Sequence, residues 1–115
     1  MPAGWPRFDL YVITDTHLSP GRSHADIARA ALAGGADAVQ LRDKSATAQN
    51  LSLLAAEIQP MARKSGAVFL VNDRVDVALV SGADGAHVGQ DDLPAREARR
   101  LLPRPAVLGV SAGTA

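Results

Sequence analysis

The sequence of 115 residues contains no cysteine and no excess of either charge. Without cysteine, a disulfide framework and thiolate metal sites are excluded. Lysine and arginine number 12 together, as do aspartate and glutamate, so no overall field draws the chain to nucleic acid or to an acidic membrane. Any anion that the protein binds must therefore be held by a local cluster of cations.

Long apolar runs are also missing. No stretch approaches the roughly 20 apolar residues that a membrane helix needs. The opening residues, Met1 to Pro6, show neither the charged nor the apolar segment of a signal peptide. These absences favour a cytoplasmic protein whose partners include no membrane and no nucleic acid. A hydrophobic content of 47% is enough for one small globular domain.

Short apolar runs rich in β-branched residues alternate with longer stretches rich in alanine and leucine. This pattern is typical of successive βα units with parallel strands, and so of an α/β fold. The predicted strands are Leu10 to Thr14, Ala38 to Arg42, Val68 to Asn72, Gly85 to Val88 and Val107 to Ser111. The predicted helices are His24 to Ala33, Ala48 to Lys64, Arg74 to Val80 and Ala95 to Leu102.

Residue types at the ends of these stretches support the helices. Ser23 suits an N-cap, with Asp26 in the first turn. Glycines stand where three helices should end, at Gly34, Gly66 and Gly82. Pro60 lies inside the second helix, where it should remove a backbone hydrogen bond or kink the helix.

One segment occurs twice, because Ala31 to Asp37 aligns with Ala78 to Asp84 at an offset of 47 residues. This offset equals two βα units. A turn repeated every second unit favours a barrel, in which alternate strands contribute to the same layers. The same Gly-Ala-Asp turn between helix and strand is also common in other α/β proteins.

The second strand is not apolar throughout, as a parallel strand covered on both faces should be. Gln40 and Arg42 share one face, Val39 and Leu41 share the other, and Lys44 follows two residues on. If the apolar pair faces the helices, the polar residues line the barrel interior or its mouth. There Arg42 is held either by a bound anion or by a neighbouring carboxylate.

Carboxylates follow the next two strands, where the active sites of such barrels lie. Asp73 comes directly after the third strand, and Asp91 and Asp92 follow the fourth. Oxygen ligands beside cations suit a hydrated Mg²⁺ that shares a phosphate with arginine and lysine. Each aspartate could instead cap the helix that follows it. His87 is predicted to face the interior as a packed histidine and is not assigned to the site.

Five segments in this order and spacing resemble the signature of the thiamine phosphate synthase family, also called thiamine-phosphate pyrophosphorylase. They are Tyr11 to Asp15, Gln40 to Lys44, Val71 to Asp73, Ala83 to Leu93 and Gly109 to Ser111. The resemblance implies a (β/α)8 TIM barrel, of which residues 1–115 would be the N-terminal portion with five strands and four helices. It also implies a transferase that joins a pyrimidine diphosphate to a thiazole phosphate with Mg²⁺ and releases pyrophosphate.

The resemblance further implies roles for particular residues. Arg42 and Lys44 would act on the pyrophosphate as catalytic residues, and Asp73 and Asp92 would hold Mg²⁺. The residues implied to bind substrate are Gln40, Leu41, Arg42, Asp43, Lys44, Asn72 and Ser111. Ionisation of the diphosphate would leave a cation that the aminopyrimidine stabilises, so the protein mainly needs to stabilise the departing pyrophosphate.

Two departures from the family pattern matter. The family commonly has a histidine two residues after the serine, where this sequence has Gly113, and this counts against a thiazole tautomerase-like protein. A complete barrel also needs roughly 200 residues or more. We therefore expect this chain to be inactive alone and to self-associate through the exposed edges of its sheet.

Two further interpretations remain open. Five βα units in this length also fit a flavodoxin-like receiver, a binding module that needs a lysine after its fifth strand. Here the fifth strand is followed by Ala112, and a receiver would not explain the Gln40 to Lys44 segment. Alternatively, the chain is a half-barrel that works only when paired with another chain.

Overall fold

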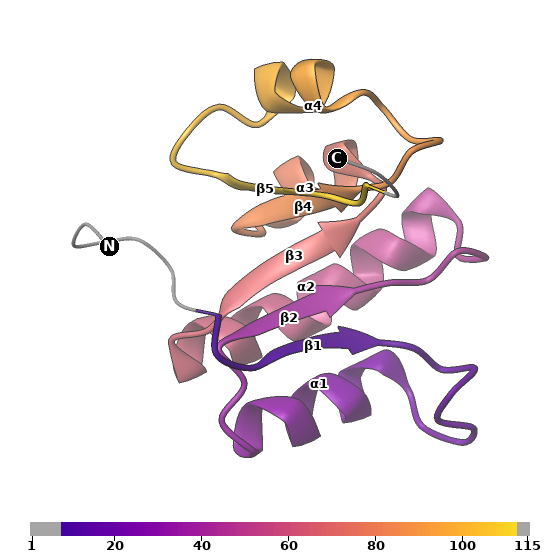
Figure 1. Cartoon of the computed structure of the whole chain (residues 1–115). Helices are drawn as coiled ribbons and strands as arrows, with labels where there is room; N and C mark the ends of the chain where they lie inside the picture. Colours follow the sequence, from indigo (N-terminus) through magenta and orange to yellow (C-terminus); the bar gives the residue numbers. More distant parts are fainter. Residues whose placement is uncertain (1–7, 113–115) are drawn as a thin grey trace.

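The computed structural model describes residues 8–112 and shows an α/β fold with five parallel strands and four helices. In Figure 1 every strand points in the same direction, and a helix follows each of the first four. The elements are β1 Tyr11–Thr14, α1 His24–Ala33, β2 Ala38–Leu41, α2 Ala48–Ser65, β3 Val68–Asn72, α3 Val75–Ser81, β4 Gly85–Val88, α4 Ala95–Leu101 and β5 Val107–Val110. All predicted elements are confirmed, with boundaries that differ by no more than one residue.

The strands lie in the order β1-β2-β3-β4-β5, so each strand pairs with its neighbours in sequence. A right-handed crossover between successive parallel strands places its helix on one particular face of the sheet. Four crossovers that all advance in the same direction therefore place the four helices on the same face, and Figure 1 shows them around the outside of a curved sheet. A flavodoxin-like sheet has the order 2-1-3-4-5 with helices on both faces, so the receiver interpretation is wrong.

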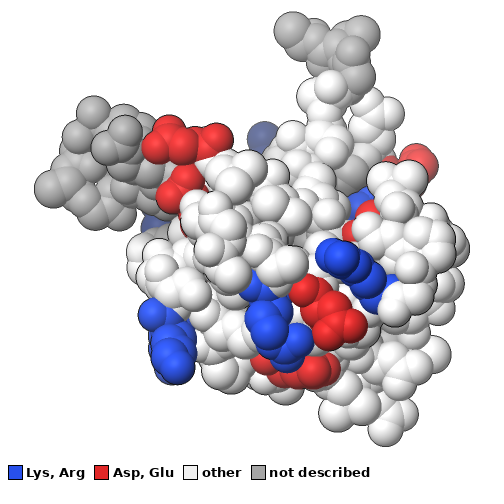
Figure 2. Space-filling view, turned by 90° about the horizontal axis from the view of Figure 1, so that it is seen from below, with Lys and Arg blue, Asp and Glu red and all other residues white. Residues whose placement is uncertain are grey.

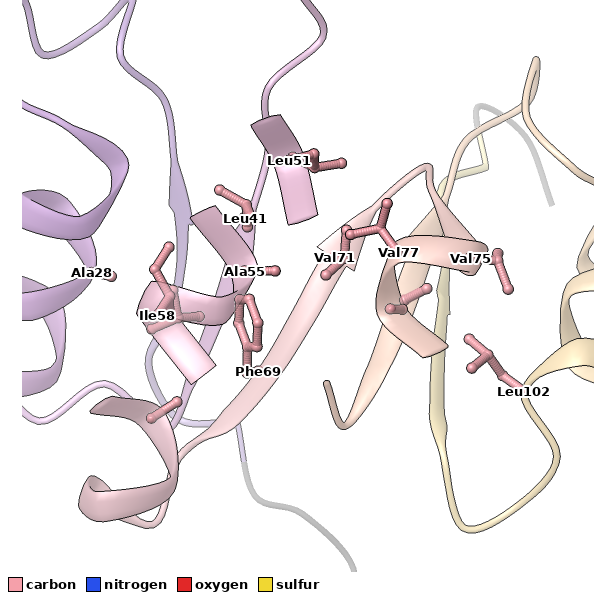
Figure 3. Packing of buried hydrophobic residues seen from close by; sticks show 14 of the residues in the cluster. Ala28, Leu41, Leu51, Ala55, Ile58, Phe69, Val71, Val75, Val77 and Leu102 are labelled. Atoms are coloured by element: carbon pink, nitrogen blue, oxygen red, sulfur yellow. The ribbon is translucent and has the colours of Figure 1, made fainter. Parts of the chain in front are cut away.

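The hydrophobic core fills the space between the sheet and the helices. It takes alternate residues from the central strands, Val39 and Leu41 from β2 and Phe69 and Val71 from β3. All four helices contribute, through buried side chains that include Ala28, Leu51, Ala55, Ile58, Val77, Ala78 and Ala98. Figure 3 shows Phe69 close to Ala55 and Ile58 of α2. The predicted orientation of Val39 and Leu41 toward the helices is confirmed.

The other residues of each strand face the opposite side of the sheet. Gln40 aligns with Ile13 of β1 and Leu70 of β3, while Asn72 aligns with His87 of β4. We call this side the inner face. Among residues 8–112 no helix covers it, and Ile13 on β1 is 48% exposed.

The helix ends follow the predicted chemistry. The Ser23 hydroxyl accepts a hydrogen bond from the backbone N–H of Asp26, and the Asp26 carboxylate accepts one from the backbone N–H of Ser23. This capping box fixes the start of α1. Gly66 and Gly82 end α2 and α3 in the left-handed conformation, which costs a glycine little.

The longest described helix, α2, runs without interruption through Pro60. The proline has no N–H to donate, so the predicted loss of one backbone hydrogen bond does not end the helix. Buried side chains on both sides of the proline, including Ile58 and Ala62, keep the helix against the sheet, and the proline itself lies on the exposed side. None of the described helices is long and apolar enough to cross a membrane.

The repeated turns have the same structural role. The Asp37 carboxylate accepts the backbone N–H of Leu10, 2.9 Å away, just before β1. Forty-seven residues later, the Asp84 carboxylate accepts the backbone N–H of Phe69 in β3 at 2.8 Å. Each aspartate thus ties the start of its own strand to the start of the preceding strand. The repeat therefore has a structural explanation at the amino ends of the strands.

One glycine in β4 marks a very close approach between strands. A Cβ atom at Gly85 would lie 1.7 Å from the carbonyl oxygen of Val107 in β5. We expect Gly85→Ala to force β4 and β5 apart and to lower the free energy of unfolding by about 1–3 kcal/mol or more. Urea unfolding followed by circular dichroism measures this loss.

The matched control is Gly34→Ala, at the end of α1. Gly34 has φ −82°, and an added Cβ would meet neighbours only at ordinary distances of 3.4 and 3.5 Å. The free energy of unfolding of Gly34→Ala should stay within about 1 kcal/mol of the wild-type value. Equal midpoints for the Gly85→Ala variant and the wild type would contradict the described pairing of β4 with β5.

Candidate functional site

Charged side chains gather where β2, β3 and β4 end. The Lys44 ammonium, after β2, forms an ion pair with the Asp73 carboxylate directly after β3. The Arg42 guanidinium lies 3.6 Å from the Asp15 carboxylate, which follows β1. Of the two possibilities for Arg42, the structure therefore shows a neighbouring carboxylate. Both cations are about half exposed, so each can also reach a ligand at this rim.

The Asp73 carboxyl group is hydrogen-bonded to the Asp92 carboxylate after β4. Burial, and then the nearby Asp92, raise the pKa of Asp73, although Lys44 opposes this shift. The hydrogen bond from Asp73 is the main cause that lowers the pKa of Asp92, which also accepts the backbone N–H of Gly89 at 2.6 Å. Asp73 is therefore the member of the pair that keeps its proton to higher pH.

The backbone at Asp73 has an unusual conformation, with φ at 72°. A left-handed conformation is uncommon for a residue other than glycine, and such residues cluster at functional sites. The Asp73 N–H donates to the carbonyl oxygen of His87 at 2.7 Å, which holds this conformation in place.

Neither aspartate caps a helix. The N-cap of α3 is Arg74 and that of α4 is Pro94, and neither helix start has a side-chain cap. The capping interpretation of Asp73 and Asp92 is therefore wrong. Their carboxylates face each other and Lys44 instead.

A row of polar side chains crosses the inner face just below the charged rim. The Gln40 amide donates to the Tyr11 hydroxyl and accepts from the Asn72 amide, each at 2.9 Å. When the Asn72 amide is turned the other way, its nitrogen lies 2.9 and 3.0 Å from the two Asp73 oxygens. Gln40 and Asn72 are both buried. When the Asn72 nitrogen faces Asp73, its oxygen faces Gln40, so the Gln40 amide must turn as well and donate to Asn72.

On the next strands the row continues through a histidine and a serine. The His87 ring lies 2.7 Å from the Ser111 hydroxyl, measured from Nε2 to Oγ. The ring passes over Gly109 of β5, where a Cβ atom would come within 2.4 Å of the His87 Nδ1. The interior position predicted for His87 is confirmed. His87 also contacts Ser111, a predicted substrate-binding residue. Sequence reasoning missed this contact.

Two residues of the predicted binding segment point elsewhere. The Leu41 side chain is fully buried in the core on the helix side of the sheet. Asp43 turns toward α1, where its carboxylate lies 3.0 Å from the His24 ring. The inner face and its rim thus receive the side chains of Gln40, Arg42 and Lys44 from this segment. A contact of Leu41 or Asp43 with substrate stays a prediction.

Sequence reasoning also overlooked Asp15 as the partner of Arg42 and Tyr11 as the partner of Gln40. Both are polar residues in or directly after an otherwise apolar strand, and this was the available signal. Gly113, which stands where the family commonly has histidine, lies outside the described residues.

Few protein side chains are placed to hold a metal ion together. Within residues 8–112, no three histidine, cysteine, aspartate or glutamate side chains come together as possible metal ligands. Asp73 and Asp92 are two carboxylates at this rim whose side chains interact and that could act together as oxygen ligands. On the face that Figure 2 shows, acidic and basic side chains are intermixed, in keeping with the net charge of zero.

The fold places the chain in the α/β class, and comparison with known proteins places it further. The sequence model of one family, described as thiamine monophosphate synthase, matches residues 10–115. The chain belongs to this family.

Relatives in several organisms agree with this assignment. The thiamine-phosphate synthase of Methanoregula boonei is 58% identical over 109 residues, which are 95% of this chain and 50% of the relative. That of Moorella thermoacetica is 52% identical over 95% of this chain and 52% of its own length. The chain thus spans about half the length of the curated relatives it matches.

A solved structure also matches. The thiamine phosphate pyrophosphorylase of Pyrococcus furiosus superposes with a TM-score of 0.79 at 37% sequence identity. The match covers 89% of this chain and 48% of that protein. The fold of the five strands and four helices is therefore that of the corresponding half of the solved enzyme.

The contacts of Asp73 lead to a prediction about its ionisation. Lys44 is the cation that lowers the pKa of Asp73, against burial and Asp92, which raise it. We expect Lys44→Met to raise the pKa of Asp73 further. The ammonium stabilises the ionised carboxylate, so without it the protonated form is favoured up to a higher pH. A ¹³C NMR titration of the aspartate carboxyl carbons measures the shift. Lys64→Met, near the other end of α2, should leave this pKa unchanged, and an equal effect of both variants would contradict the pairing.

Proposed function

We propose that this chain forms the part of a thiamine-phosphate synthase that holds the Mg²⁺ and the pyrophosphate of the pyrimidine diphosphate substrate. The observation that carries the proposal is the cluster of Lys44, Asp73 and Asp92 at the ends of three adjacent strands. The relatives' names, as synthases of thiamine phosphate, support the reaction. On this proposal the second substrate is the thiazole phosphate, and the enzyme is a transferase.

We also propose that residues 1–115 are the N-terminal portion of one (β/α)8 TIM-barrel domain. The sequential strand order supports this, because strands that follow one another around a barrel pair in this way. The single helical layer and the inner face without helices support it as well. The cytoplasmic location stays a prediction from the sequence.

The residues at the rim fit a magnesium ion. Mg²⁺ is commonly held by one or two carboxylates together with substrate phosphates and water, and it keeps several waters. Asp73 and Asp92 provide two carboxylates whose side chains interact with each other, and a cation between them could take an oxygen from each. When bound, Mg²⁺ would neutralise charge on the pyrophosphate.

The side chains of this chain would carry out the remaining steps of substrate handling. Arg42 and Lys44 would donate charge-assisted hydrogen bonds to the pyrophosphate and stabilise the negative charge that develops as it departs. Gln40 and Asn72, joined by their amides, would orient the pyrimidine on the inner face. Ser111 would contact its ring, with the hydroxyl held by His87. No nucleophile is needed, because the departing pyrophosphate leaves a cation that the aminopyrimidine stabilises.

Binding would exchange partners at the rim. Lys44 forms an ion pair with Asp73, and Arg42 lies 3.6 Å from Asp15. A divalent cation on Asp73 would compete with Lys44 and leave the ammonium free to bind the anion. Metal and pyrophosphate should therefore bind cooperatively.

The role of the two aspartates as metal ligands can be tested with two variants. We expect Asp73→Asn and Asp92→Asn each to weaken Mg²⁺ binding in the presence of pyrophosphate by at least about tenfold, because each removes a charged oxygen ligand. Isothermal titration calorimetry of Mg²⁺ into protein with excess pyrophosphate measures the affinity.

Asp91→Asn is the matched control, since it removes the same charge from the neighbouring, exposed residue. Its affinity should stay close to that of the wild type. Equal affinities for all four proteins would remove Asp73 and Asp92 from the metal site, and a loss in the control as large as in the other two would reduce the effect to general electrostatics.

A second test concerns the chain by itself. β1 and β5 each have one neighbour in the sheet, and Val110 on the helix side of β5 is 51% exposed. Unpaired edges and exposed apolar groups invite association. We expect the 115-residue protein to sediment as a dimer or larger species and to release no pyrophosphate from the two substrates.

The complementary experiment adds the second half of the Methanoregula boonei relative. Pyrophosphate release should then appear, and the sedimentation coefficient should become that of a single complex. A compact monomer that turns over both substrates without the second half would overturn the partial-barrel proposal.

A further inference from the structure

A buried histidine behind the site takes no part in the proposed chemistry. His24 is the first residue of α1 and is 4% exposed. The capping box of Ser23 and Asp26 fixes the backbone next to it. Its ring lies between the end of β1 and the segment that follows β2, on the helix side of the sheet.

Both ring nitrogens have partners. The Nδ1 atom lies 2.7 Å from the hydroxyl of Thr14, the last residue of β1 and fully buried. The Nε2 atom lies 3.0 Å from the Asp43 carboxylate. The Thr14 hydroxyl oxygen also accepts the backbone N–H of Arg42 at 3.2 Å. We call these contacts the Thr14–His24–Asp43 chain.

For a neutral His24 ring, the contacts have one consistent direction. A backbone N–H can only donate, so Arg42 donates to the Thr14 oxygen and leaves the hydroxyl proton free to point at Nδ1. An ionised carboxylate can only accept, so Nε2 carries the imidazole proton and donates it to Asp43. Burial raises the pKa of Asp43, but hydrogen bonds from Ser45 and His24 outweigh this effect and lower it overall, which keeps the carboxylate ionised.

Both ends of the Thr14–His24–Asp43 chain reach the same segment, residues 42–46. One end holds the backbone of Arg42, and the other holds the side chain of Asp43. The second Asp43 oxygen accepts from the backbone N–H and hydroxyl of Ser45 and from the backbone N–H of Ala46, at 3.0–3.1 Å. Residues 42–46 are thereby fastened to α1 and β1 on the side away from the site.

This fastening determines where the two cations emerge. Arg42 and Lys44 leave the segment on the opposite side from Asp43, toward Asp15 and Asp73. Long side chains on a mobile loop would lose conformational freedom when they bind an anion. A fixed backbone at residues 42–46 removes part of that loss before binding.

We propose that His24 is a positioning residue whose imidazole, bridging Thr14 and Asp43, holds Arg42 and Lys44 in place for pyrophosphate. The inference rests on the proposed function of Arg42 and Lys44. Supporting partners behind a binding residue commonly contribute about tenfold to a hundredfold in affinity, as documented for metal sites.

Two variants of Thr14 form a matched pair. Thr14→Val keeps the shape but removes the hydroxyl, so Arg42 loses its acceptor and Nδ1 loses its donor. Thr14→Ser keeps the hydroxyl and should preserve the chain. A third variant, Leu102→Ala, removes a buried side chain next to α4, far from the Thr14–His24–Asp43 chain. It should lower the stability of the fold without changing these hydrogen bonds.

Three measurements are made on the 115-residue protein. Calorimetry gives the affinity for pyrophosphate with excess Mg²⁺. Amide hydrogen exchange by NMR reports the protection of Arg42, Ser45 and Ala46, and the ¹⁵N shifts of the His24 ring report which nitrogen carries the proton. We expect Thr14→Val to bind at least about tenfold more weakly and to lose protection at Arg42, while Thr14→Ser and Leu102→Ala bind like the wild type.

Several results would overturn the inference. Wild-type affinity in Thr14→Val, an equal loss in Leu102→Ala, or an imidazole proton on Nδ1 in the wild type would each do so while leaving the proposed function intact. If the wild type itself binds no pyrophosphate, the proposed function fails and this inference falls with it. If Thr14→Val does not fold, Asp43→Asn, which breaks the other end of these contacts, replaces it, with lost protection at Ser45 and Ala46 as the criterion in place of Arg42.

Discussion

The structure depends on the alternation of side chains along parallel strands whose helices all lie on one face. Every second residue of β2 and β3 must be apolar to pack against the helices, as Val39, Leu41, Phe69 and Val71 do. The residues between them are released from this requirement, so Gln40 and Asn72 can be polar and hydrogen-bonded to each other. The polar residues of β2 and β3, Gln40 and Asn72, are therefore confined to one side of the sheet.

Charge at this rim is arranged in pairs rather than as a positive field. Lys44 lies against Asp73, and Arg42 lies near Asp15. An anion alone gains little from cations that are already neutralised, whereas an anion that arrives with a divalent cation supplies partners for both signs. On the proposed function, this pairing would favour a metal-bound diphosphate over a free one.

Much of this could be read from the sequence because it depends on local order. Period-two alternation predicted the opposite orientations of Gln40 and Leu41, and glycines and Ser23 marked the helix ends. The contacts that sequence could not supply join residues far apart in the chain. His24 and Asp43 are 19 residues apart, and Asp73 is paired with Lys44 from a different loop. Whether an aspartate caps its own helix or faces a neighbour depends on backbone conformation, and Asp73 adopts an uncommon one.

The two aspartates of the repeated turn have a consequence for how this fold can change. Asp37 and Asp84 each fasten the amino end of one strand to the amino end of the strand before it, at the end of the sheet remote from the charged rim. Two of the four strand pairs, β1 with β2 and β3 with β4, thus have a fixed point that involves none of the loops at the other end. A change in the length or sequence of those loops would leave both fixed points in place.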